Sequence, residues 1–241
     1  MGESLGDWLG REPFTLALSA GFFGFFAHAG VLMALEEAGR RPARVTGASA
    51  GALAGGAWSA GVSAADLRDA LFEVRREDFW DPGPGLGLLR GRRFRGLLAR
   101  LCPVERVSDC GVPLAVSFFD GLRRRTLVPR DWRFVEAVYA SCAVPFLFHP
   151  LFRKGRPYWD GGIRDRAALA ATDRDERVLC HWLPPSDERA PPAPSAGRAI
   201  ITVAGLARPG PGRLEAGRRA WHQAREAVHR ALECPLEAVT A

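Results

Sequence analysis

The chain has 241 residues, 47% of them hydrophobic and 25% charged, with a net charge of +6 and an isoelectric point near 9.6. These values fit one soluble globular domain, and no apolar segment is long enough to span a membrane. The basic residues are almost all arginine and accompany no nucleic-acid-binding motif, so the charge predicts a weak attraction to anionic membranes rather than nucleic-acid binding.

The N-terminal residues and the cysteines bear on the cellular compartment. Glu3, Asp7, Arg11 and Glu12 interrupt the N-terminus before any apolar core develops, which is not typical of a signal peptide. The five cysteines are scattered and form no CxxC pair or zinc-type cluster. We therefore expect a cytoplasmic protein with reduced thiols, without a cofactor or metal.

Strands and helices alternate along the chain, as hydrophobic periodicity and glycine positions indicate. In the first half of the chain, the pattern predicts a strand at 14–19, a helix at 28–38 and a strand at 44–46. A helix to about residue 60 and helices at 64–77 and around 94–101 follow. The second half predicts strands at 112–119 and 125–128, a helix at 131–141, strands at 178–183 and 200–206, a Pro-rich loop at 183–198 and an amphipathic helix at 212–233. This alternation favours a single α/β domain over residues 1–241, with a mainly parallel sheet.

One motif indicates a nucleophile. Ser49 is the centre of a G-x-S-x-G sequence whose glycines are Gly47 and Gly51, and it lies between a predicted strand and a predicted helix. Such an elbow forces the serine backbone into a strained conformation, and small neighbours let strand and helix approach closely. The start of the helix also favours negative charge on the serine oxygen. A tight packing turn remains the alternative explanation of this motif on its own.

Two further segments could complete such a site. Residues 19–24 again follow a strand and precede a helix, and a turn of this kind presents consecutive backbone N–H groups to a developing oxyanion. Asp160 is followed by Gly161 and Gly162, where the chain can bend and bring a carboxylate to a distant serine. Each segment alone is also explained as an ordinary turn.

In this order the motifs resemble the patatin-like phospholipase family. The resemblance extends from about residue 14 to 165: the loop Gly21–Gly24 with the following residues 28–39, the elbow at 46–53, the segment 140–145, and Asp160-Gly161-Gly162. It implies a three-layer α/β/α patatin-like fold around a mainly parallel sheet. It also implies a lipid acyl hydrolase, of phospholipase A, lysophospholipase or esterase type.

The resemblance implies a catalytic dyad rather than a triad. Ser49 would be the nucleophile, Asp160 the general base, and the backbone N–H groups of Gly21, Phe22, Phe23 and Gly24 the oxyanion hole. An unperturbed aspartate, with a pKa of ~3.9, is a poor base for a hydroxyl, so we expect a desolvated pocket that raises the pKa of Asp160. The loop departs from the family pattern, which is richer in glycine and often contains Arg or Lys.

Three alternatives remain open. An α/β-hydrolase triad would need a histidine after the acid, and His181, His222 and His229 fit poorly by position. A catalytically silent lipid-binding or scaffold protein on the same fold is suggested by the altered loop. A basic nucleic-acid-binding protein is suggested by the isoelectric point alone.

Apolar residues near the motifs predict the substrate class. Phe25 and Phe26, beside the loop, could line an acyl pocket, whereas residues 146–148 are expected to fill the core. Residues 86–100 combine leucines with arginines and could rest on an anionic lipid surface. The expected partners are a lipid or acyl-ester substrate and, peripherally, an anionic membrane.

Overall fold

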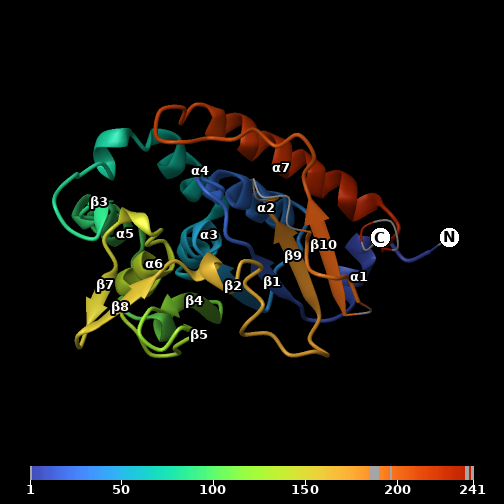
Figure 1. Cartoon of the computed structure of the whole chain (residues 1–241). Helices are drawn as coiled ribbons and strands as arrows, with labels where there is room; N and C mark the ends of the chain where they lie inside the picture. Colours follow the sequence, from blue (N-terminus) through green and yellow to red (C-terminus); the bar gives the residue numbers. More distant parts are fainter. Residues whose placement is uncertain (1, 185–189, 196, 237–238, 240–241) are drawn as a thin grey trace.

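The computed structural model describes residues 2–184, 190–195, 197–236 and 239, and a mixed sheet lies at its centre (Figure 1). The strands of this sheet lie in the order β10-β9-β1-β2-β4-β8-β7, with β5 also paired to β4. Their bounds are β1 Thr15–Leu18, β2 Arg44–Ala48, β4 Leu114–Asp120, β5 Arg125–Leu127, β7 Leu151–Arg153, β8 Arg156–Trp159, β9 Val178–Trp182 and β10 Arg198–Thr202. Two short strands, β3 Gly87–Leu89 and β6 Phe146–Phe148, pair with each other in parallel.

The sheet is mainly parallel, as the sequence predicts. Strands β10, β9, β1, β2 and β4 are joined by parallel pairs, while β5, β7 and β8 add antiparallel pairs at one end. From β1 the chain adds β2 and then β4 on one side, and it later returns to add β9 and β10 on the other. Such a reversal of strand order creates a crevice beyond the carboxyl ends of the central strands. Both loops that follow β1 and β2 open into this region.

Seven α-helices surround the sheet within the described residues. They are α1 Leu5–Arg11, α2 Phe25–Glu37, α3 Ala50–Ser59, α4 Ala64–Glu73, α5 Arg92–Leu101, α6 Phe134–Ser141 and α7 Ala216–Glu233. Helix α3 packs on β2, α2 packs on α3 and α4, and the long α7 crosses over α2 (Figure 1). This confirms a mixed α/β fold built on a central sheet.

Side chains alternate between the two faces of the sheet, as the period of a strand requires. Leu16, Leu18 and Leu179 belong to the main core beneath the helices. The opposite face carries Ala17, Val178, Cys180, Trp182 and Ile200, which pack with Ala167 and Leu169 from the β8–β9 connection. Because both faces are covered, these strands contain almost continuous apolar residues.

Several elements differ from the sequence prediction. Helix α2 begins at Phe25 rather than 28, α6 begins at Phe134 rather than 131, and β10 spans Arg198–Thr202 rather than 200–206. Elements α1, β3, β6, β7 and β8 were not predicted, because their short lengths give little periodicity to detect. The Pro-rich loop at 183–198 lies partly outside the described residues, and its last residue is the first of β10.

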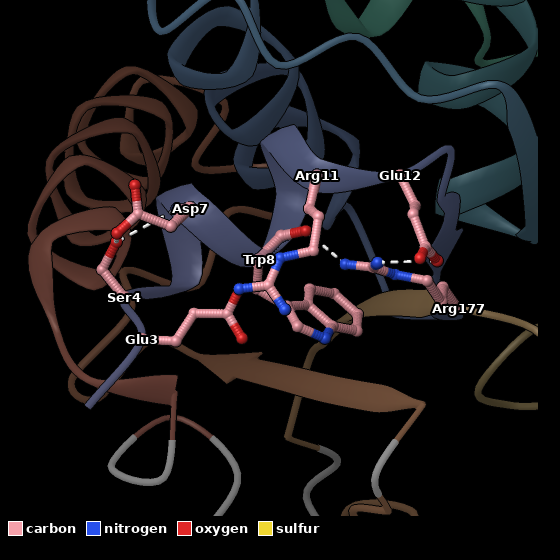
Figure 2. A network of polar contacts seen from close by, with 7 residues as sticks. All are labelled: Glu3, Ser4, Asp7, Trp8, Arg11, Glu12 and Arg177. Carbon is pink, nitrogen blue, oxygen red and sulfur yellow. Dashed lines mark hydrogen bonds and ion pairs between the residues drawn. The ribbon is translucent and has the colours of Figure 1, made fainter.

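Helix α1 is held by polar contacts that its own sequence does not reveal (Figure 2). The Ser4 hydroxyl caps its N-terminus by accepting a hydrogen bond from the Asp7 N–H at 3.0 Å. Arg177, which precedes β9, lies over the Trp8 ring at 4.3 Å, donates to the Trp8 carbonyl and pairs with Glu12 at 3.0 Å. A residue more than 160 positions away therefore fixes this helix beside the start of β9.

The contact between α2 and α7 yields a test of the fold. Gly30 of α2 lies so close to the Trp221 carbonyl of α7 that a Cβ at this position would overlap it. We expect Gly30→Ala to lower the free energy of unfolding by about 1–3 kcal/mol, because the helices must separate. The matched control is Gly96→Ala in α5, where a Cβ meets only a guanidinium nitrogen of Arg100 at 3.7 Å. The control should raise stability slightly, since alanine favours a helix, and equal effects in denaturant unfolding would contradict the packing.

Candidate active site

The turn from β2 into α3 has the geometry of a nucleophile elbow. Ser49, between the two elements, has φ 52° and ψ −117°, a conformation that costs free energy for any residue with a side chain. Helix α3 can start immediately after it because Gly51 packs directly on the Leu18 carbonyl of β1, where a Cβ would overlap the oxygen. Gly47 similarly leaves room for the first turn of the helix. The motif thus places the Ser49 hydroxyl at the carboxyl end of the sheet.

A chain of hydrogen bonds supports the strained turn from below. The Ser49 N–H donates to the Ser141 hydroxyl at 2.8 Å, and that hydroxyl donates to the Ser117 carbonyl of β4 at 2.7 Å. The Cys142 thiol lies 3.1 Å from the Ser49 carbonyl. Segment 140–145 is part of the family resemblance, but the sequence predicts no role for Ser141. Only the fold brings this segment under the elbow.

The nucleophile candidate and the carboxylate are in direct contact. The Ser49 hydroxyl donates to Asp160 Oδ2 at 2.6 Å, across 111 positions of sequence. The other oxygen of Asp160 accepts from the Gly162 N–H at 2.7 Å, and the Asp160 N–H donates to the Ala143 carbonyl at 3.0 Å. Each oxygen of the carboxylate therefore accepts one hydrogen bond, and Oδ2 is held against the Ser49 hydroxyl.

Burial changes the proton affinity of this carboxylate. Asp160 is 6% exposed, and desolvation raises its pKa to about 6. Hydrogen bonds from Ser49 and Gly162 and the charge of Arg166 oppose this rise without cancelling it. The carboxylate can therefore be ionised near neutral pH and still be basic enough to take a proton from a hydroxyl.

The loop after β1 lies beside the elbow and presents backbone donors. No described residue accepts a hydrogen bond from the N–H of Gly21, Phe22 or Phe23. The Gly24 N–H, in contrast, donates to the Gly21 carbonyl at 2.9 Å and closes a turn. We therefore correct the predicted oxyanion hole by removing Gly24 from its donors. Phe23 has a φ of 54°, so this turn carries strain as well.

The histidines do not form a triad with the candidate dyad. His28 and His181 are buried and share a hydrogen bond between their Nδ1 atoms at 2.8 Å. His28 Nε2 donates to the Ser19 carbonyl at 2.8 Å, and burial lowers the pKa of His28 to about 4. Within the described residues, no histidine bonds to Ser49 or Asp160. The neutral pair instead supports the strand that leads into the loop.

An apolar cavity of about 100 Å³ opens at Ser49. No charged side chain belongs to its described lining, which comprises Gly21, Phe22, Phe23, Phe25, Ser49, Ala50, Leu53, Ala70, Leu71, Val74, Phe79, Trp80, Leu89, Phe94, Leu97, Leu98, Leu101, Cys142, Val144, Leu147, Phe148 and Pro211. Such a surface favours a hydrocarbon chain, by ~0.8 kcal/mol for each buried methylene. One face of α5 supplies much of the wall.

The aromatic residues near the site divide differently from the sequence prediction. Phe25 lines the cavity, whereas Phe26 is 1% exposed and packs in the core against α7, where Gly217 makes room for its ring. Leu147 and Phe148 line the cavity, although they were expected only to fill the core. Phe146 is 89% exposed, so the core prediction is wrong for this residue.

The site contains no set of groups suited to a metal. Within the described ranges, no three His, Cys, Asp or Glu side chains come together in a way that could hold a metal ion. In the same ranges, no helix has both the length and the apolar character needed to cross a bilayer.

Known structures share this fold. The chain is similar to VipD from Legionella pneumophila, with a TM-score of 0.60 and 16% identity, over 92% of this chain and 67% of that one. It is also similar to ExoU in its complex with SpcU from the type III secretion system of Pseudomonas aeruginosa, with a TM-score of 0.50 and 16% identity, over 93% and 52% of the two chains.

Sequence relatives point the same way. Uncharacterised NTE family proteins of Mycobacterium tuberculosis and Mycobacterium bovis are 28% identical over 159 residues, which is 65% of this chain and 44% of each relative. The chain thus spans less than half the length of these curated relatives. The family model described as patatin-like phospholipase matches residues 16–172, which include the loop, the elbow and Asp160. With its fold and its motifs in agreement with that match, the chain belongs to the patatin-like phospholipase family.

Proposed function

We propose that this chain hydrolyses carboxylic esters of lipids through a Ser49–Asp160 dyad and an acyl-enzyme. The observation that carries the proposal is the 2.6 Å hydrogen bond from the Ser49 hydroxyl to a buried carboxylate at the mouth of an apolar cavity. Membership of the patatin-like phospholipase family supports a lipid ester as the substrate. The class includes phospholipids, lysophospholipids and acylglycerols.

Acylation uses each part of the site once. Ser49 Oγ attacks the ester carbonyl carbon while Asp160 Oδ2 accepts the hydroxyl proton. The carbonyl oxygen becomes an oxyanion, which the free N–H groups of Gly21, Phe22 and Phe23 would stabilise. When the tetrahedral intermediate collapses, the bond to the alcohol breaks, and Asp160 returns the proton to the leaving oxygen. The acyl chain then remains on Ser49, inside the apolar cavity.

Deacylation repeats the same steps with water. Asp160 accepts a proton from the water that attacks the acyl carbonyl, and it then returns this proton to Ser49 Oγ as the acid leaves. An alcohol in place of water would give acyl transfer from the same intermediate. The site therefore predicts a hydrolase whose acyl-enzyme can also serve an acyltransferase reaction.

Substitution of either dyad member tests the mechanism. We expect Ser49→Ala and Asp160→Asn each to lower kcat/KM for a soluble short-chain ester by at least about a thousandfold, because each removes one half of a unit that acts together. The matched control is Ser59→Ala, which alters a buried serine at the other end of α3. Initial-rate measurements check this, with circular dichroism to show that each variant folds.

Other outcomes discriminate between the alternatives. Activity retained in Ser49→Ala would contradict the dyad. A wild-type protein that binds lipid but never turns over ester would favour the catalytically silent protein. Salt-dependent retention of nucleic acid that persists in Ser49→Ala would favour a basic nucleic-acid-binding protein.

The raised pKa of Asp160 predicts the pH dependence of the reaction. Only the ionised carboxylate can accept the serine proton, and its pKa lies at about 6. We therefore expect kcat/KM to rise about tenfold per pH unit below 6 and to level off above it, because this ratio reports the free enzyme. Initial rates with a soluble ester between pH 4 and 8 measure the profile. A midpoint near 4 would show that the carboxylate is not desolvated.

An exposed apolar surface beside the cavity would bring the enzyme to its substrate. The paired strands β3 and β6 present Leu88 and Phe146, which are 48% and 89% exposed, and Leu86, just before β3, is 59% exposed. Leu89 and Phe148, in the same strands, turn inward to the cavity lining. The net charge of +6 adds an electrostatic attraction to an anionic surface. We propose that this β3–β6 surface rests on an anionic membrane, so that lipid can enter the cavity from the bilayer.

The β3–β6 surface can be tested by vesicle binding. We expect Leu86→Ser combined with Phe146→Asn to weaken binding to anionic vesicles at least about fivefold, because two large apolar side chains no longer enter the lipid. Asparagine is chosen because Phe146 has a φ of 65°, a conformation that asparagine tolerates. The control is Leu122→Ser, which alters a leucine 67% exposed on the β4–β5 turn beside arginines. Equal loss in both variants would contradict this surface.

A further inference from the structure

A second cavity, of about 530 Å³, lies next to the β3–β6 pair. Its polar lining comes from Arg90, Arg92, Arg95, Tyr139 and His149. Neighbouring residues divide between the two cavities: Leu89 and Phe148 line the apolar one, and Arg90 and His149 line the polar one. Strands β3 and β6 and helices α5 and α6 lie together at the end of the molecule away from the termini (Figure 1).

Three cationic side chains gather in this cavity without acidic partners. Within the described residues, no Asp or Glu pairs with Arg90, Arg92 or Arg95, and no acidic side chain belongs to the lining. Asp81, on the adjoining loop, already accepts hydrogen bonds from the N–H groups at the start of α5, with its two oxygens 2.7–3.1 Å from their donors. The cavity therefore concentrates positive charge that its own residues do not neutralise.

Contacts with Tyr139 and Gly91 hold Arg95 in place and leave part of its guanidinium group available for a ligand. Arg95 lies over the Tyr139 ring at 5.0 Å, and its Nε is 3.3 Å from the Gly91 carbonyl, so the rest of its guanidinium can face a ligand. Tyr139 in turn donates to the His149 carbonyl at 2.7 Å. His149 Nε2 is buried and has no hydrogen-bond partner in the described structure. A buried polar atom of this kind normally requires a partner.

We propose that this cavity binds a phosphate group, carried by a lipid head group or by a soluble phosphate ester. The planar guanidinium forks of Arg92 and Arg95 match the paired oxygens of a phosphate. The same α5 helix would then present hydrocarbon-binding residues to one cavity and phosphate-binding residues to the other. The site is separate from the dyad, so it does not depend on ester hydrolysis.

The test compares two double variants with the same change in net charge on the same helix. Arg92→Gln with Arg95→Gln alters the cavity, whereas Arg93→Gln with Arg100→Gln alters arginines outside its lining. All are made in the Ser49→Ala protein, so that lipid is not consumed. Inorganic phosphate binding is measured by calorimetry at constant ionic strength, and lipid binding by sedimentation with phosphatidylcholine vesicles containing phosphatidic acid.

The cavity variant should weaken binding at least about tenfold in one of the two assays, because charge-assisted hydrogen bonds are lost. The control should stay within about twofold of the parent in that assay. A loss with phosphate identifies a soluble ester as a source, and a loss with vesicles alone identifies a lipid head group. Since Arg95 also packs on Tyr139, Arg92→Gln alone is measured as a variant that leaves this stacking intact. Equal binding by the cavity and control variants in both assays, or no binding by the parent, would overturn the proposal.

Discussion

The site depends on one hydrogen bond between residues that are distant in sequence, from the Ser49 hydroxyl to Asp160. For this contact to form, β2 must end in a strained turn, and β8 must end where Asp160, the residue after it, can reach Ser49. The strained conformation of Ser49 persists because its surroundings hold it. The Ser141 hydroxyl accepts a hydrogen bond from the Ser49 N–H, and Gly51 lets α3 pack directly on β1. The parallel sheet provides the common edge at which these segments meet.

Burial of the Asp160 carboxylate has opposite effects on the stability of the fold and on the basicity of this group. The pKa of Asp160 in the folded protein, about 6, lies above its ordinary value of 3.8, so the folded chain holds this proton more tightly than the unfolded chain. Stability from this group is therefore complete at low pH and falls as the pH rises toward 6, by about 3 kcal/mol in all. The loss accompanies a buried carboxylate that is ionised near neutral pH beside the Ser49 hydroxyl. Burial therefore raises the basicity of Asp160 at the expense of the folded state.

Around the dyad, chemically different surfaces lie close together. The apolar cavity faces one side of α5, and the cationic cavity lies next to β3 and β6. A lipid has the same division between its chains and its head group. In this interpretation α5 and the β3–β6 pair present apolar groups for the chains of a lipid and charged groups for its head group. The apolar groups line the same cavity as Ser49.

The sequence predicted the parts of this molecule that local patterns determine. The elbow, the loop after β1 and the Asp160 motif are each continuous in sequence, so their residues and order could be identified, and the alternation of elements predicted the α/β fold. Ser141 could not be assigned, because its role exists only once α6 packs against β4 and brings the Ser141 hydroxyl to the Ser49 N–H. The predictions for Phe26 and Phe146 failed for the same reason: an aromatic side chain near a motif can face the core, the cavity or solvent, and tertiary packing decides which.

Covalent labelling with a fluorophosphonate, mapped by peptide mass spectrometry, tests the central claim most directly. The reagent reacts with a serine only when a neighbouring base activates it. A single adduct on the peptide that contains Ser49, formed much more slowly in Asp160→Asn, is the result that the dyad predicts. An adduct on another residue, or labelling of Ser49 at the same rate without the Asp160 carboxylate, would contradict it.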